Sequence, residues 1–534
     1  MENYRYSMGR RGMVASAHSL ISSTGLNTLR NNGNAMDAAI SMALTASVVL
    51  PDMCGIGGDT FLLYFDNSTK KVYALNGSGP MGSKYTVDFY KSKGYSVNPE
   101  HGALSISVPG TISALMEGLE KFGSKSFKDC ARDAIYYASN GFPVGKKTSE
   151  YIEKRIDTIK QSDALSRIFL DENGLPKKVH STIINKNLAS TLELLSNNSK
   201  EYFYQNFSDV YIKELNKFGA CFTSDDFKKY KAEWLEPIRL NYNDFTVFQV
   251  PPVSQGIIHL ETLNILSNFG LNKLGSSSSE QIHLMVEAKK IAFDDRIKLF
   301  GDPKFNHNPV NELLSKEYGE LKSKLINKDK TNDVTSIFEH QDKHTTSMVV
   351  VDEFENACSL ITSISDAFGS GVMDDVTGIL WNNRIGTNAN LVVNHPNCVA
   401  PNKKTMNTLN TYIILDRNSN CRFVGNTPGG DNQPQWNTQM VVHLIDNKLT
   451  LLDAIHQPLW YDAQSSNPYN KLTENILFIE NTIDKSVVDE LESKGHKVKL
   501  IDRCNCAIQL IEIKEDGILC GATDFRAEGV AIGY

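Results

Sequence analysis

Apolar and polar positions follow two different patterns along this chain, and a long polar segment separates them. Before that segment, apolar residues recur mostly at helical spacing, and residues 17–50 predict two helices joined by the Asn-Asn-Gly-Asn turn at 31–34. The helical pattern continues from about 110 to 230 and again up to about 300. Two strand pairs interrupt it, at 61–65 with 72–75 and at 238–240 with 246–250.

The polar segment covers residues 301–344, is rich in Lys, Asn and Asp, and predicts a loop or a surface linker. Beyond it strands dominate. We expect helices at 438–445 and 487–494, and strands at 347–351, 358–361, 412–415, 423–424, 498–501, 507–513 and 517–520. A helix-rich part therefore precedes a strand-rich part.

Composition narrows the class of protein. The 534 residues are 41% hydrophobic and 22% charged, which is typical of a globular chain, and the net charge of −7 argues against a nucleic-acid surface. No apolar run approaches the roughly 18 residues of a membrane span. Arg10-Arg11 has no apolar stretch behind it, so we expect no signal peptide. The nine scattered cysteines, without a CxxC pair, indicate reduced thiols in a cytoplasmic protein with no metal or cofactor.

Several common catalytic motifs are missing from the sequence: it has no GxSxG elbow, no Walker loop and no HExxH zinc helix. The glycine-dense loop Gly55–Gly58 lacks the GxGxxG spacing of a nucleotide-binding turn. A tight turn in which backbone approaches backbone is the better interpretation of this loop than a phosphate site.

The sharpest chemical feature is His344-Thr345-Thr346, where the polar segment meets a very apolar strand. Two threonines before a strand are ordinary in themselves, because β-branched residues favour strands. If the peptide bond before Thr345 is cut, however, Thr345 gains an α-amine with a pKa of about 7.7–8.0. That amine can take the hydroxyl proton near neutral pH, so one residue would supply both nucleophile and base.

Two further segments suit acyl chemistry. Thr427–Asp431 follows a strand and precedes a helix, and the N–H groups of Gly429 and Gly430 could form an oxyanion hole; a structural turn is the alternative. Ser363 and Ser365 lie on the strand after the one that carries Thr345. The Ser363 hydroxyl could hydrogen-bond the nucleophile or satisfy local backbone.

Together these segments resemble the γ-glutamyltransferase family over nearly the whole chain. The resemblance rests on ordered motifs at Gly12–His18, Gly33–Ala39, Gly55–Gly58, Thr345–Asp352, Thr377–Asn383 and Thr427–Gly430. It implies an α+β fold, a four-layer αββα sandwich of the N-terminal-nucleophile (Ntn) hydrolase type. It also implies self-cleavage between His344 and Thr345 into a helix-rich subunit 1–344 and a catalytic, strand-rich subunit 345–534, which form a heterodimer with one core. An acyl-enzyme ester on Thr345 would then pass its acyl group to water or to an amine.

The departures from the family pattern concern the substrate. Members that act on glutathione carry an arginine where this chain has Ser78, and an aspartate where it has Thr387. Their paired serines are replaced by Asn407 and Thr408. Both charged anchors for a γ-glutamyl group are therefore absent, and the loss of such a pair costs several kcal/mol of binding.

The chain looks more similar to an intracellular branch of the family that includes oxamate amidohydrolase. This similarity rests on Asn76–Gly79, on Asn383-Arg384 and on the run from Gly429 through Asp431 to Gln435. It implies hydrolysis of a small amide that bears a carboxylate. Arg384 could hold that carboxylate through its guanidinium, or it could be a structural arginine. A conventional γ-glutamyl transferase with a rebuilt pocket is the second hypothesis, and an unprocessed, non-catalytic binding protein is the third.

Overall fold

The computed structural model describes residues 6–332, 343–463 and 475–534. Two seven-stranded antiparallel sheets form the centre of the fold. Sheet A has the order β1 (Tyr6–Gly9), β18 (Leu519–Thr523), β17 (Gln509–Ile513), β13 (Cys421–Asn426), β12 (Thr411–Leu415), β9 (Phe245–Gln249), β8 (Ile238–Tyr242). Sheet B has the order β19 (Val530–Gly533), β2 (Met13–Ser16), β10 (Lys343–Val351), β11 (Ala357–Asp366), β3 (Asp59–Asp66), β4 (Lys71–Gly77), β7 (Glu233–Leu235).

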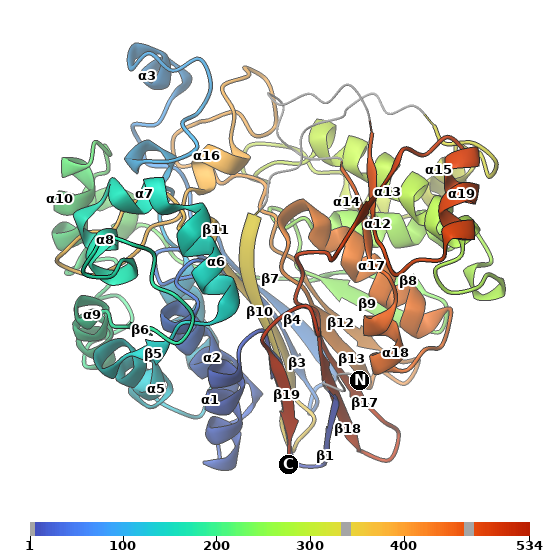
Figure 1. Cartoon of the computed structure of the whole chain (residues 1–534), viewed down its shortest axis with the longest axis horizontal. Helices are drawn as coiled ribbons and strands as arrows, with labels where there is room; N and C mark the ends of the chain where they lie inside the picture. Colours follow the sequence, from blue (N-terminus) through green and yellow to red (C-terminus); the bar gives the residue numbers. More distant parts are fainter. Residues whose placement is uncertain (1–5, 333–342, 464–474) are drawn as a thin grey trace.

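The two sheets pack face to face, and helices cover both outer faces (Figure 1). Strand β10 shows how the sequence produces this arrangement. Successive strand residues point to opposite sides of a sheet. Accordingly, Met348 and Val350 belong to the core under the helices, while Val349 and Val351 belong to the core between the sheets. A strand buried on both faces favours an unbroken apolar run, as β10 has from Met348 to Val351.

The outer helices complete the four layers. Over sheet B lie α1 (Ser19–Arg30), α2 (Ala35–Val49), α4 (Thr111–Phe122), α5 (Phe127–Asn140) and α9 (Lys186–Ser196). Over sheet A lie α12 (Gly256–Leu266), α13 (Ser279–Leu299), α17 (Gln433–Ile445) and α18 (Leu451–His456). The expected α+β fold with αββα layering is confirmed.

Smaller elements occupy the periphery and the loops. They are the helices α3 (Val87–Ser92), α6 (Lys146–Lys154), α7 (Ile156–Lys160), α8 (Asp163–Phe169), α10 (Ser208–Lys217), α11 (Ser224–Lys228), α16 (Arg384–Asn388) and α19 (Lys485–Ser493), the strands β5 (Phe142–Pro143), β6 (Thr182–Ile183), β14 (Trp460–Asp462), β15 (Leu477–Glu480) and β16 (Val498–Ile501), and short 3-10 turns. The predicted helix pair at 17–50 and both early strand pairs are confirmed, with shifts of a few residues at their ends.

The interpretation of 301–344 as a plain loop is wrong for part of the segment. It contains α14 (Val310–Leu313) and α15 (Lys316–Ser323), and β10 begins at Lys343; residues 333–342 lie outside the described ranges. Leu313 is buried, and the Ser315 hydroxyl caps α15 by accepting from the Tyr318 N–H. The buried Leu313 and the Ser315 cap stabilise these short helices. The polar composition of the segment as a whole does not predict them.

Segments from before and after the proposed cleavage point alternate within sheet B. Strands β10 and β11 lie between β2 and β3, and the C-terminal β19 pairs with β2. The two parts of the chain therefore share one core.

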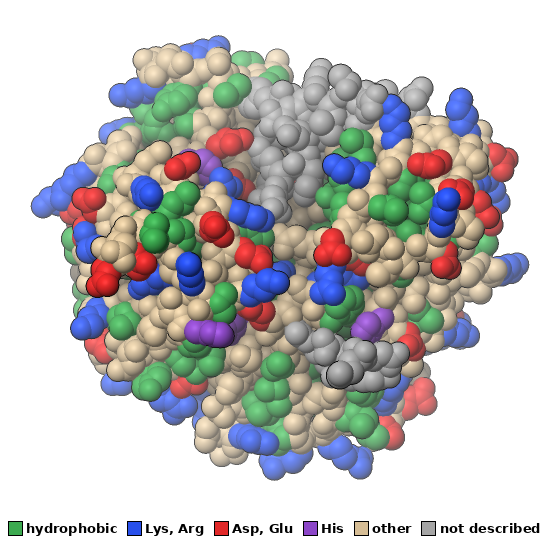
Figure 2. All heavy atoms as spheres, in the orientation of Figure 1, with side chains coloured by type: hydrophobic (Ala, Val, Ile, Leu, Met, Phe, Trp, Pro, Cys, Tyr) green, Lys and Arg blue, Asp and Glu red, His purple; other side chains and the backbone are tan. Residues whose placement is uncertain are grey.

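The surface and the cysteines add two facts. Positive and negative side chains are interspersed on the face seen in Figure 2. All nine cysteines carry free thiols, and seven of them are buried. Among the helices that the structure describes, none has both the length and the apolar character needed to cross a membrane.

Candidate active site

The peptide bond between His344 and Thr345 lies near the start of β10, in the middle of sheet B. His344 is paired with Ser365, but Thr346 is paired with Thr362, so two residues of β11 oppose Thr345 alone. Such a β-bulge changes the direction of nearby side chains and is common beside active sites. Thr345 is buried, and within the described residues its hydroxyl has no hydrogen-bond partner.

Ser363 contacts this peptide bond directly. Its hydroxyl donates to the carbonyl oxygen of His344 at 2.6 Å and accepts from the Ser365 N–H at 2.8 Å. A carbonyl oxygen can only accept, so the single proton of the Ser363 hydroxyl points at His344. A donor held in this position polarises the carbonyl carbon and stabilises negative charge that develops on the oxygen.

Thr345 and Gly429 line the same small cavity, of about 20 Å³, together with His344 and Pro428. About 10–15 Å³ is enough to admit one water molecule. The N–H groups of Gly429 and Gly430 donate no hydrogen bond to any residue that the structure describes. Free N–H groups next to a hydroxyl are what an oxyanion hole requires.

The backbone at this turn requires glycine. Gly429 has φ 132° and Gly430 has φ 56°, both in the region that disfavours other residues. A β-carbon at Gly429 would also collide with the Trp436 ring. The turn leads through Gly430–Asn432 into α17, so a helix N-terminus faces this end of the sheet.

Arg384, the first residue of α16, belongs to a group of buried polar side chains around Asp59. Its Nε donates to Asp59 Oδ2 at 3.0 Å, and Asn407 Nδ2 donates to the same oxygen at 3.0 Å. Its Nη1 lies 3.5 Å from Thr408 Oγ1, and its buried Nη2 has no partner among the described residues. Asp59 is directly opposite Ser363 in the β3–β11 ladder, which places this group beside the peptide bond between His344 and Thr345. Burial raises the pKa of Asp59, and the Arg384 guanidinium opposes that rise.

The remaining predicted residues fall into two groups. Thr387 lies with the site, because its hydroxyl is 2.7 Å from the Ser365 hydroxyl. Ser78 is buried and bonds to Asn76 Oδ1 through both its N–H and its hydroxyl. Asp431 accepts from Arg296 Nη1 at 2.6 Å in an ion pair with both side chains 1% exposed, so it is held within the core.

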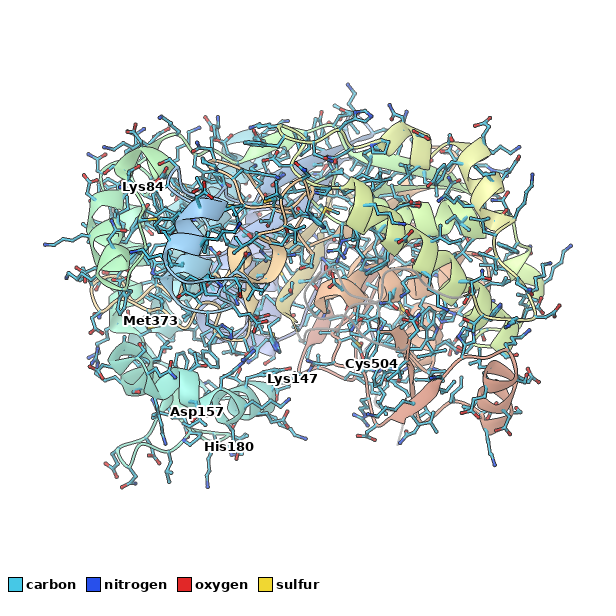
Figure 3. All side chains as sticks on the ribbon, turned by 90° about the horizontal axis from the view of Figure 1, so that it is seen from above. Lys84, Lys147, Asp157, His180, Met373 and Cys504 are labelled. Atoms are coloured by element: carbon cyan, nitrogen blue, oxygen red, sulfur yellow. The ribbon has the colours of Figure 1, made fainter. Side chains whose placement is uncertain are left out.

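Sequence patterns gave no indication of Lys147 or Asp59. Lys147 lines the cavity with Thr345 and donates to Asn505 Oδ1 at 3.2 Å. Figure 3 shows it reaching from α6 toward the segment that carries Cys504. Nearby, burial raises the pKa of Asp52 to about 6, although the Thr148 hydroxyl bonds to its carboxylate. Lys147 lies in none of the motifs, and Asp59 directly follows the Gly55–Gly58 motif, but only the packing of elements far apart in sequence brings these residues to the site.

Comparisons with known proteins agree with this architecture. Residues 21–534 match the family model described as gamma-glutamyltranspeptidase. The glutathione hydrolase-like YwrD proenzyme of Bacillus subtilis (strain 168) is 33% identical over 532 residues, which cover 98% of this chain and 99% of that protein. The oxamate amidohydrolase proenzyme of Klebsiella pneumoniae is 28% identical over 535 residues, or 98% of each chain.

Among solved structures, a cephalosporin acylase from Bacillus halodurans superposes with a TM-score of 0.91 at 29% identity, covering 100% of this chain and 98% of that one. The expected Ntn-hydrolase fold and the resemblance drawn from the motifs are both confirmed. With a family model that spans nearly its whole length and relatives aligned from end to end, this chain belongs to the gamma-glutamyltranspeptidase family of Ntn hydrolases.

Proposed function

We propose that the protein cleaves itself before Thr345 and then hydrolyses a small amide through an ester on that threonine. The observation that carries the proposal is the Ser363 hydroxyl on the carbonyl oxygen of His344, next to the buried Thr345 hydroxyl, which has no partner among the described residues. The hydroxyl oxygen of Thr345 attacks the carbonyl carbon of His344. The C–N bond breaks, the Thr345 nitrogen takes the hydroxyl proton, and water hydrolyses the resulting ester.

The freed α-amine then acts as the base for substrate turnover. It takes the Thr345 hydroxyl proton as the oxygen attacks the substrate carbonyl, and it delivers that proton to the leaving nitrogen. The N–H groups of Gly429 and Gly430 hold the negative oxygen of the intermediate. Water releases the acid from the ester and restores the enzyme.

For the substrate, we favour an amide that bears a carboxylate, of the oxamate type. Arg384 supports this choice, because its Nη2 is buried and unpartnered among the described residues, and a guanidinium N–H is a strong carboxylate donor. Ser78 and Thr387 are neutral, so they do not supply the charged anchors of a γ-glutamyl site. One aligned relative is named as an oxamate amidohydrolase.

The test has two parts. Thr345→Ala should leave one full-length band on a denaturing gel and no activity, whereas the unaltered protein should give two fragments. Fragments in the variant would refute Thr345 as the nucleophile. A single band from active unaltered protein would refute self-cleavage, and a single inactive band would favour the binding-protein hypothesis.

Substrate choice is decided by comparing ammonia release from oxamate with p-nitroaniline release from a γ-glutamyl anilide. Turnover of the anilide alone would favour the conventional γ-glutamyl transferase, which other aligned relatives named glutathione hydrolase also support. Arg384→Met should raise KM for oxamate more than it lowers kcat.

A further inference from the structure

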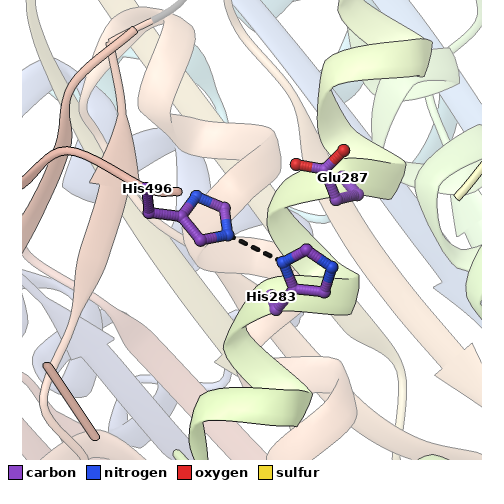
Figure 4. A group of neighbouring side chains, drawn as sticks. All are labelled: His283, Glu287 and His496. Carbon is purple, nitrogen blue, oxygen red and sulfur yellow. Dashed lines mark hydrogen bonds between the residues drawn. The ribbon is translucent and has the colours of Figure 1, made fainter. Parts of the chain in front are cut away.

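A second group of chemically reactive side chains lies away from Thr345. His283 and Glu287 are one turn apart on α13, and His496 lies in the loop between α19 and β16 (Figure 4). One potential ligand atom from each residue lies within 4.8 Å of the others, and all three residues are buried. A bond from the His496 N–H to the Leu491 carbonyl at the end of α19 fixes the loop that carries His496.

The hydrogen bonds show which ring nitrogen of His283 carries no proton. Its Nε2 lies 2.7 Å from the Asn327 carbonyl oxygen, and a carbonyl only accepts, so Nε2 carries the proton. Nδ1 is therefore an unprotonated nitrogen that faces His496 Nε2 at 2.7 Å. A ring held from behind by a backbone carbonyl is the arrangement that metal-binding histidines typically have.

The charge states also suit a cation. The hydrogen bonds use one proton per ring, so each neutral imidazole keeps one lone pair for a ligand bond. Burial opposes the ionisation of Glu287, but the Lys290 ammonium and the hydrogen bonds from Asn332 and Thr331 together lower the carboxyl pKa. Two imidazoles and a carboxylate are the ligand set of zinc and similar divalent ions, whereas calcium and magnesium prefer oxygen ligands.

We propose that His283, Glu287 and His496 form a site for one divalent transition-metal ion of the zinc type. The two facing nitrogens are closer than the about 3.3 Å that tetrahedral ligation at about 2.0–2.1 Å requires. The rings would therefore move apart slightly as the ion replaces the shared proton, which His496 would then carry on its other ring nitrogen, Nδ1. Lys290 contacts Glu287 at 2.8 Å and repels the ion. This repulsion limits the affinity.

The position of the site suggests that the ion would hold the two fragments together, an inference that rests on the proposed cleavage. His283 and Glu287 precede Thr345, and His496 follows it, so the ion would join the two fragments. The Glu287 carboxylate also accepts from the Thr331 hydroxyl at 2.8 Å and the Asn332 N–H at 3.0 Å. The ion would therefore also order the end of the described segment that precedes residue 333.

The experiment is a titration of the metal-stripped full-length protein with Zn²⁺, followed by calorimetry and by the rise in Tm, with Co²⁺ as a spectroscopic probe of tetrahedral ligation. We expect one equivalent to bind and raise Tm. His496→Gln and Glu287→Gln should each weaken binding at least tenfold, while His456→Gln, at an exposed histidine, leaves it unchanged. Lys290→Met should tighten binding, an effect that damage to the fold cannot imitate.

The proposal would be overturned if the unaltered protein showed no saturable binding. It would also be overturned if His496→Gln and Glu287→Gln bound Zn²⁺ as tightly as the unaltered protein. The same titration on uncleaved Thr345→Ala protein separates the two hypotheses, because the three ligands are present whether or not the chain is cut. Binding there without cleavage of the unaltered protein would support the metal site and refute self-processing.

Discussion

The Ser363 hydroxyl donates a 2.6 Å hydrogen bond to the carbonyl oxygen of His344, a residue 19 positions earlier on the neighbouring strand. The oxygen belongs to the peptide bond that precedes the proposed nucleophile. Because the strands and the Ser365 N–H hold the donor in place, no reorganisation is needed when charge develops on that oxygen. This geometry makes Ser363 the residue whose removal should most selectively slow self-cleavage.

Ser363→Ala should slow the appearance of the two fragments about a hundredfold or more, the usual cost of one oxyanion donor. Ser363→Thr keeps the hydroxyl and should retain most of the rate. Band intensities on denaturing gels over time measure both. Equal rates for the alanine variant and the unaltered protein would contradict the assigned role.

Gly429→Ala should be far more damaging than Gly94→Ala. At both positions a left-handed backbone costs a non-glycine residue about 1–2 kcal/mol. At Gly429 the new methyl group also collides with the Trp436 ring, whereas nothing lies within 4 Å of a β-carbon at Gly94. Cleavage rate and Tm of the two variants provide the comparison. If the alanine at 94 were the worse of the two, the ring contact would not be the decisive constraint.

Asp59→Asn should destabilise the chain by about 3–5 kcal/mol, because it leaves the buried Arg384 cation without its partner. Adding Arg384→Met to it should restore part of that loss. Urea unfolding in the Thr345→Ala background keeps the protein as one chain and gives the free energy of unfolding. Additive effects of the two substitutions would show that the residues are not coupled.

Acid should destabilise the fold through its buried histidines. Burial lowers the pKa of His259 to about 3 and that of His443 to about 4. As pH falls below the ordinary value of 6.5, the unfolded chain takes up protons that the folded chain refuses, so stability is lost from pH 6.5 down to about pH 4. Each ring adds up to about 1.4 kcal/mol per pH unit to this slope.

His443→Gln should remove one such contribution while its amide can still bond to Asn447. Urea midpoints across this pH range measure the slope. If the variant showed the same dependence of stability on pH as the unaltered protein, the His443 ring would take up its proton as readily in the folded chain as in the unfolded one.

Much of this molecule follows from local sequence. The Asn34 side chain accepts from the Asp37 N–H, and the Asp37 carboxylate accepts from the Asn34 N–H. This capping box starts α2 where the turn residues predict a helix. A strand that faces solvent on one side alternates apolar and polar residues, whereas the unbroken apolar run Met348–Val351 is typical of a strand buried on both faces, as β10 is. Thr345 and the Gly429–Gly430 turn stand out for the same reason, because a threonine before an apolar strand and a glycine pair before a helix are patterns of a few consecutive residues.

Only the tertiary structure decided which side chains meet. The contacts of Ser363 with His344, of Arg384 with Asp59, and of His283 with His496 join positions 19, 325 and 213 residues apart. Sheet order and helix packing set such distances, and no periodicity along the chain encodes them. The same reason explains why Asp431, polar and next to the glycine turn, lies in a core ion pair with Arg296.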